Sequence, residues 1–302
     1  MVRSDGRAGL PFNQFEQTWA GCMDIDALWD FDDLPASKAR LEAALAAATA
    51  PQDQAIWLTQ LARMAGLEGD FTQGELLLDQ AEAIGPTAAT TARITLERAR
   101  LAREEGRSAM AATGFHQAAG QARAAAATDV ALDALHMQAI AAPPAVARAI
   151  VDQAERLTRE APSQRHWLGP FYNNLGWALF EAGEIADALE MFNRDKALRR
   201  SLGAENERRV AGVNAAKMLR YLGRNAEALD QLQRLVVEIG PQGFGLGLVF
   251  EERAELAFAT GKPEEARHYA DEARRLFEAR GMSADQHPSR FARLSHLAEP
   301  TG

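Results

Sequence analysis

Apolar residues along most of the 302-residue chain recur at the three- and four-residue spacing of an amphipathic helix. The stretches that carry this pattern are long and rich in Ala, Leu, Glu and Arg, all of which are good helix formers. Short breaks that contain Gly or Pro separate them, and no sustained alternation of apolar and polar residues indicates a strand. The pattern predicts an all-α protein.

A recurring glycine divides this pattern into helical hairpins. The turn glycines are Gly69, Gly106, Gly183, Gly223 and Gly261. Their successive separations are 37, 77, 40 and 38 residues, so the long one corresponds to two periods with one glycine missing. Ala142-Pro143-Pro144 falls where that turn belongs, because Pro is well suited to the first position of a helix. We therefore expect six hairpins between about residues 53 and 280.

Side-chain size also repeats around these turns. Seven residues before the glycines stand Ala62, Ala99, Gly176, Ala216 and Ala254. Five residues after them stand Gly74, Ala111, Ala188, Ala228 and Ala266. Nine residues after them stand Leu78, Phe115, Phe192, Leu232 and Ala270. The small residues would let the two helices of a hairpin cross closely, and the mostly bulky third set would fill the space between hairpins, so each hairpin needs its neighbours.

One of these hairpins carries a known repeat motif. The motif is Tyr172-x2-Leu175-Gly176-x2-Leu179 followed by Ala188-x3-Phe192. It resembles the tetratricopeptide repeat (TPR), with Tyr in place of Trp and Leu in place of Tyr, and the period near forty is similar to the longer repeats of kinesin light chains and of many bacterial regulators. The resemblance covers roughly three quarters of the chain and implies a right-handed superhelical solenoid of antiparallel helix hairpins. Arg98 and Arg253 depart from it, at a site that is usually apolar.

The two ends of the chain lack the repeat pattern and set the expected domain boundaries. Residues 1–33 are expected to form an N-terminal extension, and residues 34–285 the array, with a covering helix at its start. Residues 286–302 are expected to form a capping helix and a tail.

The N-terminal extension contains an apolar stripe that is interpreted as a docked helix. Phe12, Phe15 and Trp19 stand at helical spacing, three and four residues apart. Met23 is an alternative start of the protein, since the residues before it carry no repeat pattern.

Composition and charge limit the functions that the chain can have. It is 47% hydrophobic and 25% charged, and its 33 Lys+Arg against 42 Asp+Glu give a net charge of −9. This acidity argues against nucleic-acid binding, which relies on clustered cations. No apolar run approaches the ~20 residues of a membrane-spanning helix, and no secretory signal is evident, so we expect a cytoplasmic protein without membrane insertion. Cys22 is the only cysteine, which excludes an intramolecular disulfide.

No catalytic, cofactor or metal motif is found in the sequence. Phosphate-loop, zinc-protease and nucleophile-elbow spacings are absent. The glycine-rich stretch 243–247 is interpreted as a connection between helices, and the Asp cluster in 24–33 as a solvated face with a helix cap, because it lacks the Gly and Glu of a calcium loop. His136 is expected to be a buried core histidine. We therefore expect no enzyme activity, no cofactor and no metal.

The first helix of each hairpin is expected to line a concave surface. Residues ten, six and three positions before each turn glycine share one face of that helix. This face is basic through the first and fifth turns, aromatic and amide-bearing around Asn173, Trp177 and Phe180, and acidic at Glu251, Glu252 and Glu255. The candidate peptide-binding residues are Arg63, Arg100, Arg103, Asn173, Trp177, Phe180, Asn214, Lys217 and Arg220.

This gradient of charge favours a peptide with carboxylates at one end. Arginine would bind a carboxylate bidentately, Trp177 and Phe180 would contact an apolar side chain, and the two asparagines would pair with the main chain of the peptide. The alternative is that the arginines pair with neighbouring acids such as Glu97 and Glu104, in surface pairs worth ~0 to 1 kcal/mol that imply no partner.

The sequence thus favours a non-catalytic adaptor or scaffold that binds an acidic or carboxylate-bearing peptide segment in a concave groove. The alternative is a bacterial regulator that responds to a peptide or a small effector. The expected partner is a protein or peptide, and association with further copies of the chain stays open.

Overall fold

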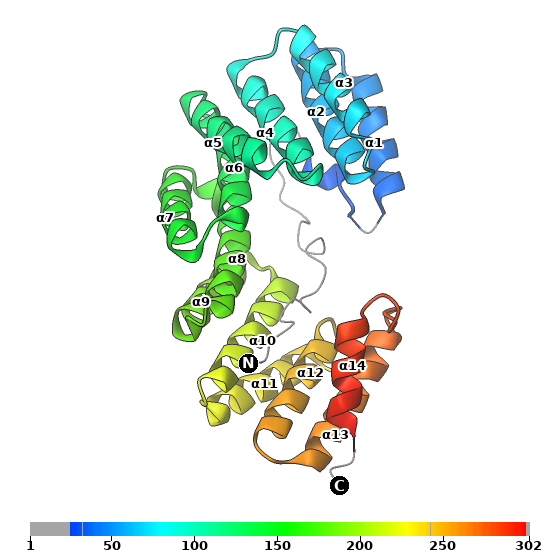
Figure 1. Cartoon of the computed structure of the whole chain (residues 1–302), viewed down its shortest axis with the longest axis vertical. Coiled ribbons are helices and arrows are strands. Elements are labelled where there is room, and N and C mark those ends of the chain that lie inside the picture. The colour runs from blue at the N-terminus through cyan, green and yellow to red at the C-terminus, as the bar shows by residue number, and fades with distance from the viewer. Residues whose placement is uncertain (1–24, 32, 242, 300–302) are drawn as a thin grey trace. The chain divides into compact units, whose positions relative to one another are not determined.

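The computed structural model describes residues 25–31, 33–241 and 243–299, and every regular element in these ranges is a helix (Figure 1). The elements of the first half are η1 (Asp26–Leu28), α1 (Leu34–Ala47), α2 (Pro51–Leu67), α3 (Phe71–Ala83), α4 (Ala88–Glu104), α5 (Ser108–Ala124), α6 (Thr128–Ala141), α7 (Pro144–Glu160) and η2 (Pro162–Trp167). Those of the second half are α8 (Leu168–Glu181), α9 (Ile185–Leu202), α10 (Glu205–Tyr221), α11 (Asn225–Ile239), α12 (Leu246–Ala259), α13 (Pro263–Glu278) and α14 (Pro288–Ala298). The predicted all-α class is confirmed.

The described chain divides into two compact units, which we call the N-terminal unit, ending at Trp167, and the C-terminal unit, beginning at Leu168. Within each unit, consecutive helices pack against each other. Several first helices also pack against the next but one, namely α2 against α4, α4 against α6 and α10 against α12, and α12 packs in the same way against α14. The first helices of successive hairpins therefore form a layer of their own within each unit.

The turns inside the hairpins lie where the sequence predicts them. All five turn glycines have a positive φ, between 71° and 81°, a conformation that costs glycine little because it has no Cβ atom. The sixth turn, which lacks glycine, lies between the end of α6 at Ala141 and the start of α7 at Pro144. Six hairpins result, from α2/α3 to α12/α13.

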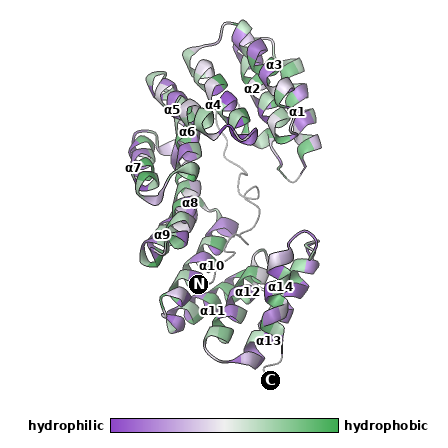
Figure 2. Ribbon diagram, in the orientation of Figure 1, coloured by the Kyte–Doolittle hydropathy of each residue, from purple (hydrophilic) through white to green (hydrophobic). Residues whose placement is uncertain are grey.

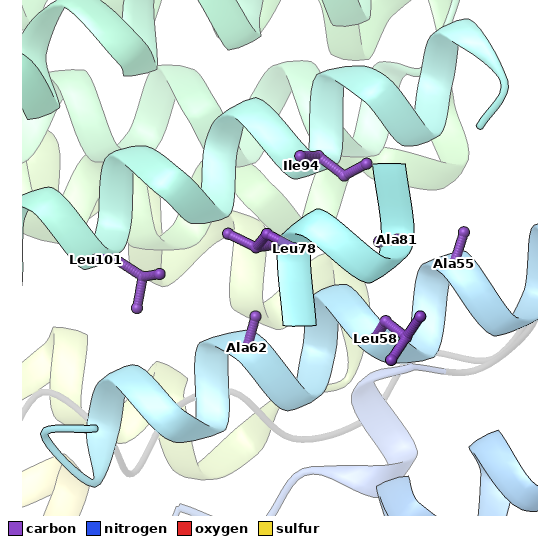
Figure 3. Packing of buried hydrophobic residues seen from close by; sticks show 7 residues of the cluster. All are labelled: Ala55, Leu58, Ala62, Leu78, Ala81, Ile94 and Leu101. Carbon is purple, nitrogen blue, oxygen red and sulfur yellow. The ribbon is translucent and has the colours of Figure 1, made fainter. Parts of the chain in front are cut away.

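The core of each hairpin lies between the recurring small and bulky positions, and all three predicted sets are buried. Figure 3 shows one such cluster, in which Ala62 of α2, Leu78 of α3 and Leu101 of α4 lie between three helices. A Cβ atom on Gly176 would lie 2.9 Å from the ring of Phe192, so a side chain there would collide with the ring. In Figure 2 the helices carry both hydrophobic and hydrophilic residues, as expected when one face of a helix is buried.

Two helices pack at the ends of the hairpin series. α1 begins at Leu34, where the side chain of Asp33 accepts a hydrogen bond from the amide of Ala36 at 3.0 Å, so this member of the Asp cluster is a helix cap. α1 packs against α2, and α14 packs against α12 and α13. No helix in the described part of the chain is long and apolar enough to cross a membrane.

The glycine-rich stretch 243–247 is only partly a connection, because α12 already begins at Leu246 and Gly247 lies where a Cβ atom would be 2.8 Å from the ring of Phe277. His136 is buried, as predicted, and its ring lies 6.1 Å from that of Trp167. The expectations for the N-terminal aromatic stripe, for the alternative start and for the cysteine concern residues 1–24, which lie outside the described residues.

Candidate functional site

The N-terminal unit contains a pocket that brings together the three predicted arginines of its first helices. Arg63 comes from α2, and Arg100 and Arg103 from α4. The cavity has a volume of about 120 Å³. Its lining is completed by α6 and by one residue that precedes α1, and consists of Phe31, Arg63, Gly66, Leu67, Arg100, Leu101, Arg103, Glu104, Asp133, His136, Met137 and Ile140.

Arg100 is held in place by carboxylates of the chain itself. Its Nε lies 3.1 Å from Oε2 of Glu97 and its Nη2 contacts Oδ1 of Asp133, while Nη1 lies 3.0 Å from the sulfur of Met137. The side chain of Glu97 is only 1% exposed, and this burial raises its pKa. Burial also acts to raise the pKa of Asp133, but the attraction of Arg100 and Arg63 and the hydrogen bond from Arg100 together outweigh it and lower the pKa overall. Arg100 is therefore a fixed part of the pocket lining. Its ion pair with Glu97 agrees with the alternative interpretation of the sequence, in which the arginines pair with neighbouring acids.

The other two arginines have different surroundings. Arg103 pairs with its sequence neighbour Glu104 at 2.5 Å, and both side chains are about 40% exposed. The guanidinium of Arg63 lies over the rings of Trp29 and Phe31, at 5.1 and 5.5 Å from their centroids. The indole of Trp29 in turn donates a hydrogen bond of 3.0 Å to Oε1 of Gln60 on α2. This aromatic wall precedes the repeats, so no spacing within the repeats indicates it.

The C-terminal unit carries a row of four aromatic rings on its first helices, which we call the aromatic row: Trp177, Phe180, Tyr221 and Phe258. Trp177 and Phe180 are in edge contact at 5.8 Å, and Phe180 contacts Tyr221 of the next hairpin at 4.8 Å. Tyr221 is 50% exposed and Phe258 is 43% exposed. The row therefore offers apolar surface to a partner, across three hairpins.

Each ring of the aromatic row lies beside a cation. The ammonium group of Lys217 is 5.2 Å from the ring of Trp177 and 5.7 Å from that of Phe180. Arg220 lies 4.9 Å from the ring of Tyr221, and Arg293 of α14 lies 5.3 Å from that of Phe258. Exposed cation–π contacts of this kind contribute about 0.5 to 1 kcal/mol each. Three of the predicted residues, Trp177, Phe180 and Lys217, are thus brought together.

The acidic end predicted for the groove is wrong, because the three glutamates of α12 are paired with cations. Glu252 accepts two hydrogen bonds from Arg220, at 2.5 and 3.2 Å, and Glu255 accepts two from Arg293, at 2.7 and 2.8 Å. Glu251 pairs with Arg290 of α14 at 3.1 Å. The arginines of α14 follow the last turn glycine and belong to no hairpin, so the spacing rule does not include them.

Burial and pairing act against each other on these carboxylates. Burial raises the pKa of Glu251 and of Glu252, in spite of their arginine partners. For Glu255 burial also acts to raise the pKa, but the hydrogen bonds from Arg293 and the attraction of Arg220 lower it overall. Arg220 is therefore engaged within the protein, since it neutralises a buried carboxylate.

The remaining predicted positions differ in how much they are exposed. Asn173 is half-buried and donates a hydrogen bond to the side chain of Asn174 at 3.3 Å, whereas Asn214 is only 9% exposed. Thr59 and Leu96, ten positions before their glycines, are fully buried. The expectation that such positions line the groove is wrong there, because α2 and α4 pack against each other. In α8, by contrast, the position ten before the turn is the half-buried Asn173.

The chain has the fold of tetratricopeptide repeat proteins. A tetratricopeptide repeat protein from Parabacteroides merdae matches with a TM-score of 0.50 and 16% identity, over 90% of this chain and 97% of that one. NprR in complex with its cognate peptide NprX matches with a TM-score of 0.50 and 14% identity, over 90% and 81%. A Rap protein complexed with competence and sporulation factor matches with a TM-score of 0.53 and 13% identity, over 91% and 79%. No protein-family model and no curated protein sequence matches the chain.

Proposed function

We propose that the protein is a non-catalytic adaptor that binds an extended, acidic peptide segment on the aromatic row of its C-terminal unit. The observation that carries this proposal is the pairing of rings with cations along three successive hairpins, where Tyr221 and Phe258 are exposed and Trp177 and Phe180 are half-buried. An exposed apolar surface with polar groups at its rim is typical of a surface that binds another protein. A repeat array offers such a surface over the length of a peptide.

Lys217 is the cation best suited to receive a carboxylate of the peptide. It lies over Trp177 and Phe180, and it forms no ion pair within the described part of the chain. An ammonium group on a flexible stem can turn towards a guest while its methylene groups stay on the rings. An apolar side chain of the peptide would then lie against Phe180 and Tyr221, beside the carboxylate.

The asparagines and Arg220 have supporting roles in this proposal. Asn173 lies one turn before Trp177 on α8 and is half-buried, so its amide can pair with the main chain of the peptide. Asn214, which is largely buried, would contact the peptide only at its edge. Arg220 positions the ring of Tyr221 and holds Glu252, and is thus a positioning residue.

Two proteins with this fold have structures in complex with a binding partner. NprR is bound to its cognate peptide NprX, and a Rap protein to competence and sporulation factor. They support the proposal only by showing that an array of this kind can bind such partners. The residues that would bind here are argued from the geometry of this chain alone.

The test is binding of defined peptides to the full chain, measured by fluorescence anisotropy. The probes are two labelled ten-residue peptides of equal length, one combining Glu with Leu and Phe and the other combining Lys with Leu and Phe. We expect the acidic peptide to bind and the basic one not to bind. We also expect binding to weaken as salt is raised, because Lys217 is partly exposed and salt screens its charge.

Two matched variants locate the site. Lys217→Gln should weaken binding of the acidic peptide about fivefold to tenfold, the loss of one charge-assisted contact. Lys262→Gln removes the charge of another lysine of the same unit, which pairs with Glu265 at 3.2 Å and lies outside the row, and should leave affinity unchanged. Equal affinity of the wild type and Lys217→Gln would reject the aromatic row as the binding site.

A second candidate function is that of a regulator whose conformation changes when a peptide or a small effector binds. The complexes of NprR with the peptide NprX and of a Rap protein with competence and sporulation factor, two proteins with the same fold, favour it. Small-angle scattering of the full chain with and without the acidic peptide separates the two functions. A change in radius of gyration on binding supports the regulator, and an unchanged value supports the rigid adaptor.

A further inference from the structure

We infer that the pocket of the N-terminal unit binds a small carboxylate that carries a short, branched apolar group. The pocket combines arginines from α2 and α4 with apolar side chains from α2 and α6. It lies within one unit and shares no residue with the aromatic row. The inference therefore goes beyond the proposed function, since such a ligand would bind here even if no peptide bound the row.

The volume of the cavity sets the size of the apolar group. An apolar cavity of ~150 Å³ can hold benzene. The cavity here is somewhat smaller, at about 120 Å³, which matches a branched chain of about four carbons. Leu67, Met137 and Ile140 supply its apolar lining, and Leu67 and Ile140 are about 40% exposed, so the group has an open path into the cavity.

The arginines around the cavity indicate an acid as the ligand. Arg103 pairs only with Glu104 among the described carboxylates, in an exposed contact of a kind worth about 0 to 1 kcal/mol, so a guest carboxylate can replace it at little cost. Arg63 is held over two aromatic rings, which fixes the position of its guanidinium group. Two guanidinium groups on neighbouring helices can bind the two oxygens of one carboxylate.

The balance of charge around the pocket also favours an anion. Three guanidinium groups line it, against the carboxylates of Asp133 and Glu104. Glu97 lies behind Arg100, and its burial disfavours the charged form. Arg100 keeps Asp133 engaged, so that carboxylate repels an incoming anion less than an unpaired one would.

Two kinds of ligand combine a carboxylate with a branched apolar group: a free branched-chain acid, and the last residue of a peptide with a free carboxylate. Isothermal titration of the full chain distinguishes them. The probes are 4-methylpentanoate, its amide, and a five-residue peptide that ends in Leu, with either a free or an amidated C-terminus. We expect the free acid to bind with a Kd on the order of 1 mM, as its few heavy atoms allow, and the amides at least tenfold more weakly.

Each result decides a part of the inference. Binding of 4-methylpentanoate alone supports a small acid as the ligand, and tighter binding of the peptide with a free C-terminus supports a peptide end. Equal binding of acid and amide, or no saturable heat with either carboxylate up to about 10 mM, ten times the expected Kd, would overturn the inference.

Variants in the same helix region test the site. Arg103→Gln should weaken binding at least fivefold. The matched control is Arg107→Gln, because Arg107 is similarly exposed and also pairs with a nearby glutamate, Glu105, but lies outside the pocket. Ile140→Trp should abolish binding by filling the cavity, and circular dichroism should show that each variant is folded. An Arg103→Gln protein that binds as well as wild type would exclude this pocket.

A variant of the aromatic row distinguishes a failure of this inference from a failure of the proposed function. Lys217→Gln should leave the affinity for 4-methylpentanoate unchanged, and Arg103→Gln should leave the affinity for the acidic ten-residue peptide unchanged. If Lys217→Gln weakens binding of the small acid, the carboxylate site lies in the row and the inference fails, although the proposed function stands.

Discussion

The two units present the cations of their first helices in different ways. In the N-terminal unit, Arg100 lies between two carboxylates at the wall of a cavity, where it is only 9% exposed. In the C-terminal unit, Lys217, Arg220 and Arg293 lie over aromatic rings of an open row. The same positions of a repeat thus give a small pocket in one unit and an extended surface in the other. The difference arises from which residues surround the cation.

The comparison also shows which arginines belong to the framework of the array. Arg100 links α4 to α6, and Arg220 links α10 to α12, so each pair joins the first helices of adjacent hairpins. Arg103 and Lys217, one turn away, make no such link to a carboxylate within the described chain. A binding role is better assigned to the second kind of cation. Lys217 also attracts the buried Glu251 and Glu252, but these keep their ion pairs with Arg290 and Arg220 when Lys217 is removed.

The largest effect is expected from breaking the links between hairpins. Arg100→Met leaves two buried carboxylates without their cation, and Arg220→Met leaves one, so each should lower the free energy of unfolding by about 3 to 5 kcal/mol, with Arg100→Met the larger loss. Urea denaturation followed by circular dichroism measures both. Arg234→Met, which breaks a surface pair with Asp230, is the control and should cost less than about 1 kcal/mol. Equal losses in all three variants would contradict the framework role.

The second prediction concerns a buried ion pair on a second helix of the C-terminal unit, which the equivalent helix α5 of the N-terminal unit lacks. On α9, Asp195 accepts a hydrogen bond of 3.1 Å from Arg199, and both side chains are less than 10% exposed. The equivalent positions on α5 are Ala118 and Ala122, also buried. Burial raises the pKa of Asp195 to about 6 from its ordinary 3.8, although Arg199 acts to lower it.

The sign of the pH effect follows from this raised pKa. The folded protein binds a proton at Asp195 more tightly than the unfolded chain, so this group contributes stability that is fully present below about pH 4 and is lost as the pH rises through 6. The difference of about two pKa units corresponds to about 2 to 3 kcal/mol. Asp195→Asn lacks this contribution, so the wild type should gain stability relative to the variant between pH 7.5 and pH 4.5. Parallel curves of stability against pH for the two proteins would show that the prediction is wrong.

Much of the fold can be predicted from the sequence, because the turns and the close helix crossings depend on residue size. The five turn glycines have the positive φ that their spacing suggests, and the proline turn replaces the missing one. Ala62, Gly176 and their equivalents are buried because two helices cross at these positions. These requirements concern residues within one hairpin, so the positions that meet them can be found by counting along the sequence.

The sites were predicted less well, because their contacts join residues that are far apart in sequence. Arg220 and Glu252 are 32 residues apart, and Arg293 and Glu255 are 38 apart. A count within one hairpin does not show that the acid of one repeat neutralises the arginine of another. The wall formed by Trp29 and Phe31 lies outside the repeats altogether. The spacing of residues before each turn predicts which face of a helix they share. It does not predict which side chains of other helices pair with that face.

The third prediction compares the helix crossings of the two units and has the smallest expected effect. A Cβ atom on Gly74 would lie 2.9 Å from the methyl ends of Leu101, and one on Gly176 would lie 2.9 Å from the ring of Phe192. A leucine methyl can move by a small rotation, whereas a phenyl ring enclosed by the core has little room. Ala also gains about 1 kcal/mol over Gly in helix propensity.

Gly74→Ala should therefore be nearly neutral, and Gly176→Ala should lower the free energy of unfolding by about 1 to 2 kcal/mol, since overpacking outweighs the gain in propensity. Urea denaturation of both variants provides the measurement. Combining Gly176→Ala with Phe192→Leu should cost less than the sum of the two single changes, because the smaller side chain leaves room for the new methyl group. If Gly74→Ala is the more damaging variant, the difference between the two crossings lies in the backbone rather than in the side chain that faces the glycine.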